Sequence, residues 1–160
     1  MSAARDIGEP RRLAELATAV RESSLKRLRA VPAGAEQWRP TSGAMSFADL
    51  AQHLLDADDW LRRKLDDPSI TGMKGEAGCS AVATRADFEA LVERLAASGR
   101  RRAARLAALG ADELEERIDD DRFGGEVSRW WVIVRGNLDH EAHHRGQLAT
   151  YLRLVAVERK

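Results

Sequence analysis

The sequence predicts an all-α protein, a four-helix bundle with a long crossover connection, and three observations lead to this prediction. Helix-forming residues dominate the 160-residue chain, and aromatic residues make up only 5% of it. Apolar residues recur at helical spacing in four segments of about 20 to 30 residues. Two of the connections are long, so the helices need not alternate strictly up and down. At this length we expect a single domain over residues 1–160.

The first predicted helix covers residues 9–31. Pro10 suits its first turn, because a missing N–H costs nothing there. Leu13, Val20 and Leu28 belong to its apolar stripe. Pro32 ends the helix, and residues 32–45, with two prolines and two glycines, are typical of a loop.

The second and third predicted helices have the same start signal. Ser46 precedes Asp49 by three residues, and Thr84 precedes Asp87 by three, which is the spacing of a capping box. The second helix continues to residue 65, before an Asp-Asp-Pro sequence, and residues 69–83 form a long connection. The third continues to residue 109, with Gly110 as its C-cap. Three consecutive arginines at 100–102 are interpreted as a solvated helix face, with a phosphate site as the alternative.

Two features precede the last helix. The Gly-Gly pair in the sequence F-G-G-E at 123–126 predicts a turn that closes a small hairpin. Ser128 then caps a helix that we expect to continue without a break to residue 157. Its predicted apolar stripe comprises Trp130, Val134, Leu148, Leu152 and Val155.

Charge and composition exclude several classes of protein. Lys and Arg number 26, as do Asp and Glu, so the formal net charge is zero, whereas a dedicated nucleic-acid binder would show a large basic excess. No apolar stretch is long enough for a membrane span, and the N-terminus lacks the apolar segment of a secretory signal. Cys79 is the single cysteine, which excludes an internal disulfide. We expect a cytoplasmic protein with no membrane or nucleic-acid partner.

The histidines give the first indication of function. His140, His143 and His144 lie within five residues of one another. At about 100° per residue, His140 and His144 are about 40° apart beside the apolar stripe, whereas His143 faces away from it. His53 has the same position relative to the stripe of the second helix. If these two helices are neighbours, three imidazoles converge at one end of the bundle.

Three converging neutral imidazoles suit a divalent metal ion. His140 and His144 would supply an i,i+4 pair of ligands and His53 the third. Three protein ligands leave one position open for water or substrate, which is the layout of a catalytic site. The alternative is that the three are hydrogen-bonded polar residues at helix edges.

Residues 140–144 also match the H-E-x-x-H motif of zinc proteases. We reject that interpretation because only 16 residues follow His144, and no strand-rich region could hold an extended peptide. Glu141 is interpreted as a solvated or packing-edge residue, with a general base as the alternative.

Further residues could support the site. Asp49, Asp56 and Gln147 lie about one turn from a histidine and could orient the imidazoles; for the two aspartates, salt bridging or solvent exposure is the alternative. Four aromatic residues could wall a pocket or belong to the core, namely Trp60, Trp130, Trp131 and Tyr151.

At these histidines the sequence resembles the DinB-like family, also called DinB/YfiT-like metalloenzymes. The segments that carry the resemblance are M-S-F-A-D-L at 45–50 leading into Q-H-L at 52–54, and H-E-A-H-H-R-G-Q-L at 140–148. It extends over nearly the whole chain and implies a four-helix bundle with a long crossover. It also implies a divalent metal, zinc or nickel, on His53, His140 and His144.

The resemblance extends to function. The best-understood branches of the family are thiol-dependent S-transferases and an isomerase that use low-molecular-weight thiols such as mycothiol or bacillithiol. It therefore implies a small-molecule substrate, a thiol cosubstrate and a homodimer. A metal-dependent hydrolase and a non-enzymatic metal-binding stress-response protein remain the alternatives.

Overall fold

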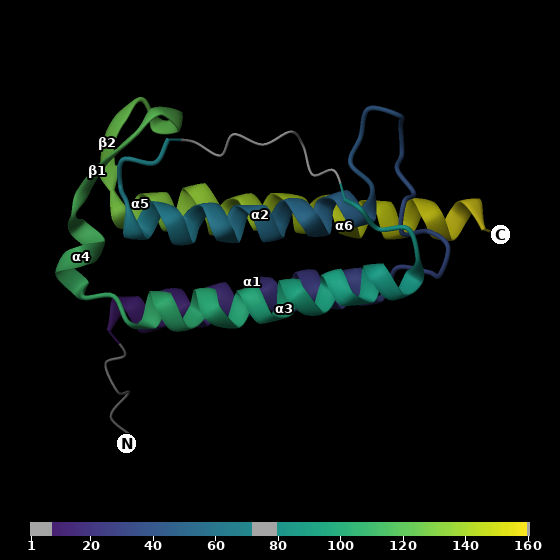
Figure 1. Cartoon of the computed structure of the whole chain (residues 1–160), viewed down its shortest axis with the longest axis horizontal. Helices are drawn as coiled ribbons and strands as arrows, with labels where there is room; N and C mark the ends of the chain where they lie inside the picture. The colour runs from purple at the N-terminus through teal and green to yellow at the C-terminus, as the bar shows by residue number, and fades with distance from the viewer. Residues whose placement is uncertain (1–7, 72–79, 160) are drawn as a thin grey trace, which may run out of the picture.

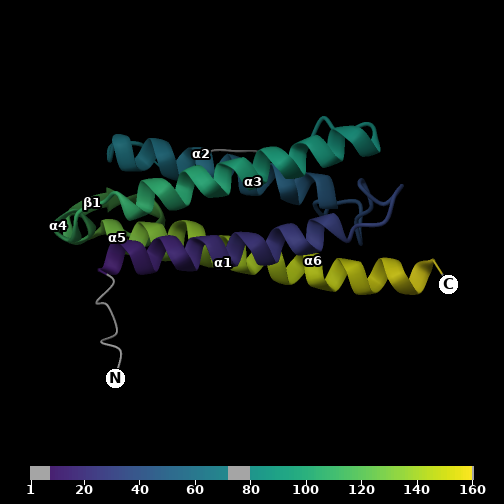
Figure 2. The same cartoon turned by 90° about the horizontal axis from the view of Figure 1, so that it is seen from below.

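The computed structural model describes residues 8–71 and 80–159. Four long helices lie side by side: α2 and α6 form one layer and α1 and α3 the other in Figure 1, and Figure 2 shows α2 beside α3 and α1 beside α6. Their bounds are α1 Glu9–Arg29, α2 Phe47–Asp66, α3 Arg85–Ala107 and α6 Asp139–Glu158. The all-α, four-helix prediction is confirmed. In Figure 1, α2 and α3 run in the same direction, so α2 ends and α3 begins at opposite ends of the bundle. Cys79 and the middle of the predicted 69–83 connection lie outside the described residues.

Both predicted capping boxes are present. Ser46 Oγ accepts a hydrogen bond from the Asp49 backbone N–H at 3.0 Å, and Asp49 Oδ2 accepts one from the Ser46 N–H at 2.9 Å. Thr84 and Asp87 make the same exchange at 3.1 and 2.9 Å. Each box satisfies two backbone donors that a helix start leaves unpaired, which is why α2 and α3 begin where the sequence predicts.

The predicted end of the third helix is wrong. The helix stops at Ala107 and is capped by Ala108, whose N–H bonds to the carbonyls of Ala104 and Leu106. Gly110 instead begins a short helix, α4 (Ala111–Glu115), and donates its N–H to Glu113 Oε2 at 2.6 Å. The first helix also ends two residues early, at Arg29 rather than residue 31.

A small antiparallel hairpin follows α4, as predicted. Strand β1 (Arg117–Asp120) pairs with β2 (Gly125–Ser128), and the 3-10 turn η1 (Asp121–Phe123) connects them. Gly124 and Gly125 have φ of 78° and 138°, values that residues with a side chain rarely adopt. The Gly-Gly pair therefore sets where the hairpin turns.

The last predicted helix is not continuous. Ser128 caps α5 (Arg129–Ile133) as expected, but a π-helical turn, η2 (Val134–Leu138), separates α5 from α6. The π turn adds a residue to one turn of the helix and shifts the register of everything after it. Trp130 and Val134, predicted in the apolar stripe, are therefore only half-buried, while Val132 and Ile133 are fully buried in their place.

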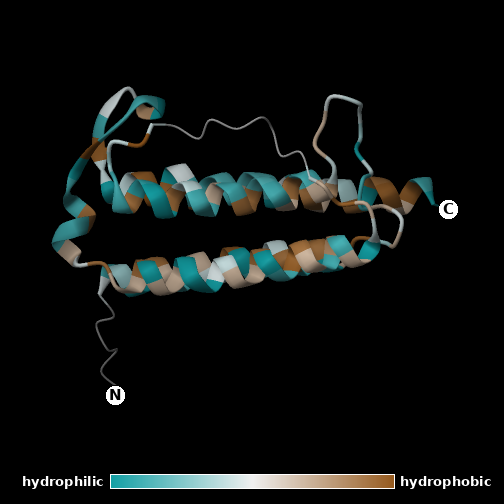
Figure 3. Cartoon of the chain, viewed as in Figure 1, coloured by the Kyte–Doolittle hydropathy of each residue, from teal (hydrophilic) through white to brown (hydrophobic). Residues whose placement is uncertain are grey.

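The interior has two apolar clusters with a polar layer between them. One cluster includes Leu28, Phe47 and Leu95, and the other Leu61 and Ile133. Figure 3 shows the hydrophilic residues that interrupt the hydrophobic ones along the long helices. Buried polar residues between the clusters come from all four helices and from η2, namely Arg21, Asp58, Arg102, Asn137, Glu141 and His144. None of the described helices has the length and apolar character that a membrane crossing requires.

Candidate metal centre

The three predicted histidines converge in the structure. His53 comes from α2, and His140 and His144 come from the first turns of α6. His140 Nε2 lies 2.9 Å from His53 Nε2 and 3.0 Å from His144 Nε2. One ligand atom from each residue lies within 4.8 Å of the other two. The expectation that α2 and α6 bring these rings to one point is thus met in geometry, and metal binding by them stays a prediction.

The surroundings keep the three rings neutral. His144 is buried, and the other two are half-buried. Burial lowers the pKa of His140 to about 3, with additional repulsion from His144 and His53. Burial also lowers the pKa of His144 to about 4 and shifts that of His53 downward. Neutral imidazole is the form that binds a metal ion, so the site needs no proton release at neutral pH.

Gln147 fixes the tautomer of His144. Its Oε1 lies 2.6 Å from His144 Nδ1. An amide oxygen can only accept a hydrogen bond, so Nδ1 carries the proton and the lone pair of Nε2 faces the other two rings. Gln147 was one of the residues that the sequence proposed as an orienting partner, and it has that position here.

The hydrogen bonding of the cluster is incomplete, and this bears on whether a metal fits. His140 Nδ1 is buried and has no partner among the described residues. Its Nε2 faces two other Nε2 atoms, and a single proton on it can serve only one of them. Three imidazole nitrogens aimed at one point are a donor set that suits zinc or nickel. Nitrogens about 2.0–2.1 Å from a tetrahedral ion are about 3.4 Å apart, so His140 needs to move only a few tenths of an ångström away from each of the other two rings.

His143 does not belong to the cluster. It is exposed, as predicted, and only the edge of its ring approaches His144, with 5.0 Å between ring centroids. It therefore offers a control position on the same helix.

The two aspartates follow the alternative interpretation. Asp49 accepts hydrogen bonds from the Ser46 and Ser80 backbones and pairs with Arg39 at 3.2 Å. Asp56 is exposed and bonds to Gln52, and only its charge acts on His53.

The four aromatic residues also favour the core interpretation over a pocket wall. Trp60 is buried in the apolar cluster that includes Leu61. Tyr151 packs edge-on against Trp38 and Phe47 in the other cluster. Trp130 is half-buried and Trp131 is exposed.

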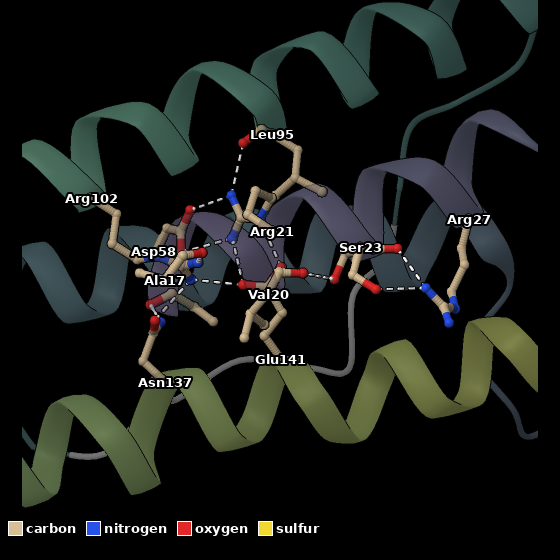
Figure 4. Close-up of polar contacts among 12 residues, drawn as sticks. Ala17, Val20, Arg21, Ser23, Arg27, Asp58, Leu95, Arg102, Asn137 and Glu141 are labelled. Carbon is tan, nitrogen blue, oxygen red and sulfur yellow. Dashed lines mark hydrogen bonds and ion pairs between the residues drawn. The ribbon is translucent and has the colours of Figure 1, made fainter. Parts of the chain in front are cut away.

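The position of Glu141 differs from the predicted one. This residue is 1% exposed and lies in a buried ion-pair network with Arg21, Arg102 and Asp58 (Figure 4). Arg21 donates to Glu141 Oε1 and Oε2 at 2.8 and 3.0 Å, and Arg102 donates to Oε2 at 2.7 Å. Burial raises the pKa of Glu141, but the two guanidinium groups outweigh it and hold the pKa at about 2. A solvated position is wrong, and a carboxylate held in this way is unsuited to act as a general base.

The network joins all four long helices. Both arginines also pair with Asp58, at 2.9 Å each. Arg102 additionally bonds to Asn137 Oδ1 and the Ala17 carbonyl, and its Nε is the one guanidinium nitrogen of the pair that lacks a partner among the described residues. The arginine run at 100–102 is therefore not uniformly a solvated face.

Sequence reasoning missed this network, although a signal was present. Arg21 lies four residues after Ala17 and seven before Leu28, in the apolar register of its helix. Asp58 lies likewise between Leu54 and Leu61. Two opposite charges at core positions of different helices predict a buried pair.

A cleft of about 640 Å³ lies between α2 and α3. Asp58 and Arg102 are among its lining residues, together with exposed arginines of α3 and aspartates of α2, and none of the three histidines lines it. The cleft and the histidine cluster are thus separate features of the bundle.

Comparison with known proteins agrees with this architecture. The family model described as the DinB superfamily matches residues 16–148. Among solved structures, the chain is similar to the crystal structure of YjoA, a DinB-like protein from Bacillus subtilis, with 19% identity and a TM-score of 0.67 over 91% of this chain and 92% of that chain. At this identity the likeness to YjoA concerns the fold. A comparison with curated proteins gives no match.

Proposed function

This chain belongs to the DinB superfamily, and from that premise we propose that it is a divalent-metal-dependent enzyme whose ligands are His53, His140 and His144. We further propose that it transfers a group to or from a low-molecular-weight thiol. The observation that carries the proposal is the convergence of three neutral imidazoles from α2 and α6, with Nε2 atoms 2.9 and 3.0 Å apart. The thiol rests on the resemblance in the segment at 140–148.

The residues around the rings support an open site. A divalent cation on three neutral imidazoles, zinc or nickel, supplies Lewis-acid chemistry and lowers the pKa of a thiol or water that reaches its free position. Gln147 holds the proton on His144 Nδ1 and so keeps Nε2 available. His53 is half-buried, which leaves the cluster within reach of a small molecule. The homodimer implied by the resemblance is part of the same proposal.

Metal content tests the ligand assignment. We expect about one equivalent of zinc or nickel in protein purified without a histidine tag, measured by inductively coupled plasma mass spectrometry. His53→Ala, His140→Ala and His144→Ala should each lose it, and His143→Ala, the matched control on the same helix, should keep it. Equal loss in all four variants would show that the assignment is wrong.

Activity assays separate the three functional alternatives. The metal-loaded protein is incubated with a panel of low-molecular-weight thiols and a chromogenic electrophile, and separately with a chromogenic ester. Thiol-dependent turnover that disappears in His144→Ala supports the transferase. Ester hydrolysis without a thiol supports the hydrolase, in which water takes the place of the thiol. Bound metal without either activity supports a metal-binding protein that catalyses no reaction.

A further inference from the structure

Arg122 is held rigidly between the hairpin and the bundle. It lies in η1, and its Cζ is 3.9 Å from the centroid of the Trp60 ring. Its Nε and Nη2 bind the Asp120 carboxylate at 3.0 and 2.9 Å, and Asp120 is buried. A Cβ placed on Gly136 would lie 2.7 Å from Arg122 Nη2, so the absence of a side chain at 136 makes room for the guanidinium. Aromatic stacking and a two-point ion pair together fix its orientation.

Arg122 lies on the same side of the bundle as the histidine cluster. Trp60 follows His53 by seven residues on α2, which is two helical turns on one face. Gly136 precedes His140 by four residues, which is one turn, or about 6 Å along the axis. The two contacts of Arg122 therefore lie along the same pair of helical segments as the three rings.

One edge of the Arg122 guanidinium is free to bind a ligand. Asp120 occupies the edge formed by Nε and Nη2, and Nη1 has no partner in the part of the chain that the structure describes. The side chain is 27% exposed, whereas those of Arg21 and Arg102 are 3% and 4% exposed in the buried network. A cation that is both fixed and accessible loses little side-chain entropy when it binds an anion.

We propose that Arg122 binds the carboxylate of a small-molecule substrate whose reacting atom lies at the His53–His140–His144 cluster. This inference rests on the proposed function and adds the substrate class: an organic acid whose carboxylate lies one to two helical turns, about 6–10 Å, from the reacting atom. The alternative is that Arg122 only anchors the hairpin to Trp60, which predicts no preference for anions.

The first experiment needs no metal. The indole N–H signal of Trp60 in a ¹H–¹⁵N spectrum, assigned with Trp60→Phe, reports on the guanidinium stacked against that ring. In metal-free protein we expect propionate to shift this signal in a saturable manner and propionamide to leave it in place. Arg122→Met should abolish the shift. Arg135→Met removes an exposed arginine that pairs with Asp139, and should preserve it. A native protein that does not distinguish propionate from propionamide overturns the inference.

The second experiment links the carboxylate to the histidine cluster. In cobalt-loaded protein, the sulfur-to-cobalt absorption band measures Kd for 6-mercaptohexanoate, whose extended chain can span the proposed distance, and for the neutral 6-mercaptohexan-1-ol of the same length. We expect the acid to bind about tenfold more tightly, which is the ratio that one charge-assisted hydrogen bond provides. Arg122→Met and Gly136→Ala should remove the preference, the second by displacing the guanidinium without deleting it, and Arg135→Met should keep it.

Failure of the inference about Arg122 and failure of the proposed function give different results in these two experiments. Equal affinities for the two thiols in native protein, or a preference that survives in both Arg122→Met and Gly136→Ala, overturn the inference. A native protein that binds no cobalt overturns the proposed function instead, and the propionate titration then decides the role of Arg122 alone.

Discussion

The histidine cluster and the buried ion-pair network meet on a single turn of α6, yet they differ in how their polar atoms are satisfied. Glu141 lies between His140 and His144 in the sequence, and both of its oxygens bind arginine. All four carboxylate oxygens of Asp58 and Glu141 have partners, and the two positive charges balance the two negative ones; among the described residues, Arg102 Nε is the one guanidinium nitrogen left without a partner. In the histidine cluster, His140 Nδ1 has no partner within residues 8–71 and 80–159, and His140 Nε2 faces the Nε2 atoms of the other two rings.

This difference indicates that the two parts of the polar layer have different roles, one in stability and one in metal binding. A polar network whose charges are paired contributes rigidity, whereas buried groups left unsatisfied in a native structure call for an explanation such as an ion. The network connects α2 and α6, the two helices that carry the histidines, to α1 and α3. We therefore expect the network to govern stability and the cluster to govern metal affinity, and the variants below test that separation.

The largest expected effect is on folding, from Arg102→Met. This change leaves Glu141 and Asp58 buried with one guanidinium between them, and breaking a buried pair costs about 3–5 kcal/mol. The free energy of unfolding is measured by urea denaturation. The neighbouring Arg101→Met, on an exposed residue, should change it by no more than about 0.5 kcal/mol. Similar losses in both variants would mean that the network does not hold the bundle together.

The second effect is stabilisation by metal. Zinc at about a hundred times its Kd should raise the unfolding free energy of the native protein by about 2.7 kcal/mol, because it binds only the folded state. The shift is measured as the increase in urea midpoint on adding zinc. His140→Ala should show no increase and His143→Ala the full one. An increase that persists in His140→Ala would place the metal elsewhere in the chain.

A smaller effect is expected from Gln147→Ala. Without its acceptor the His144 ring loses its fixed tautomer, and loss of such a hydrogen bond to a ligand typically lowers metal affinity about 10–100-fold. Competition with a chromogenic chelator measures the affinity. Gln52→Ala removes a glutamine that bonds to the exposed Asp56, and its affinity should match that of the native protein. A fold stability unchanged in Gln147→Ala would sharpen the contrast between the two polar regions.

The smallest effect isolates stability from binding. Ser46→Ala removes one half of the α2 capping box and should cost about 1 kcal/mol of unfolding free energy without touching either polar region. Chelator competition should give an unchanged metal affinity. A drop in affinity as large as that of Gln147→Ala would show that the histidine geometry depends on overall stability, contrary to the separation described above.

Local signals predicted most of the fold. Ser46 and Thr84 mark helix starts because each has its capping partner three residues away. The Gly-Gly pair determines the hairpin turn within a few residues of itself. The convergence of His53 with His140 and His144 also follows from helical periodicity, because each ring lies at the same offset from an apolar stripe. These features depend on spacing along the chain, which the sequence displays directly.

The missed features depend on partners that are distant in sequence. Arg21 and Glu141 are 120 residues apart in the sequence. A count of charged residues does not distinguish one at a core position from one on the surface. The π turn at 134–138 has no comparably clear signal, since only its hydrogen-bond pattern differs from that of an α-helix. The contact of Arg122 with Trp60 could not be predicted for the same reason, because it forms only when the hairpin packs against α2.

The η2 turn has a consequence for how this site tolerates changes in chain length. A π turn accommodates one extra residue in a wider turn, so deleting one residue between positions 134 and 138 would restore a regular α-helix and leave the later side chains at nearly the same angle around the axis. His140 and His144 would still face His53, whereas the same deletion in the regular helix α5 would rotate them about 100° away from it. In relatives of this chain, the loss of one residue at η2 should therefore be compatible with the histidine cluster, and the loss of one residue within α5 should not.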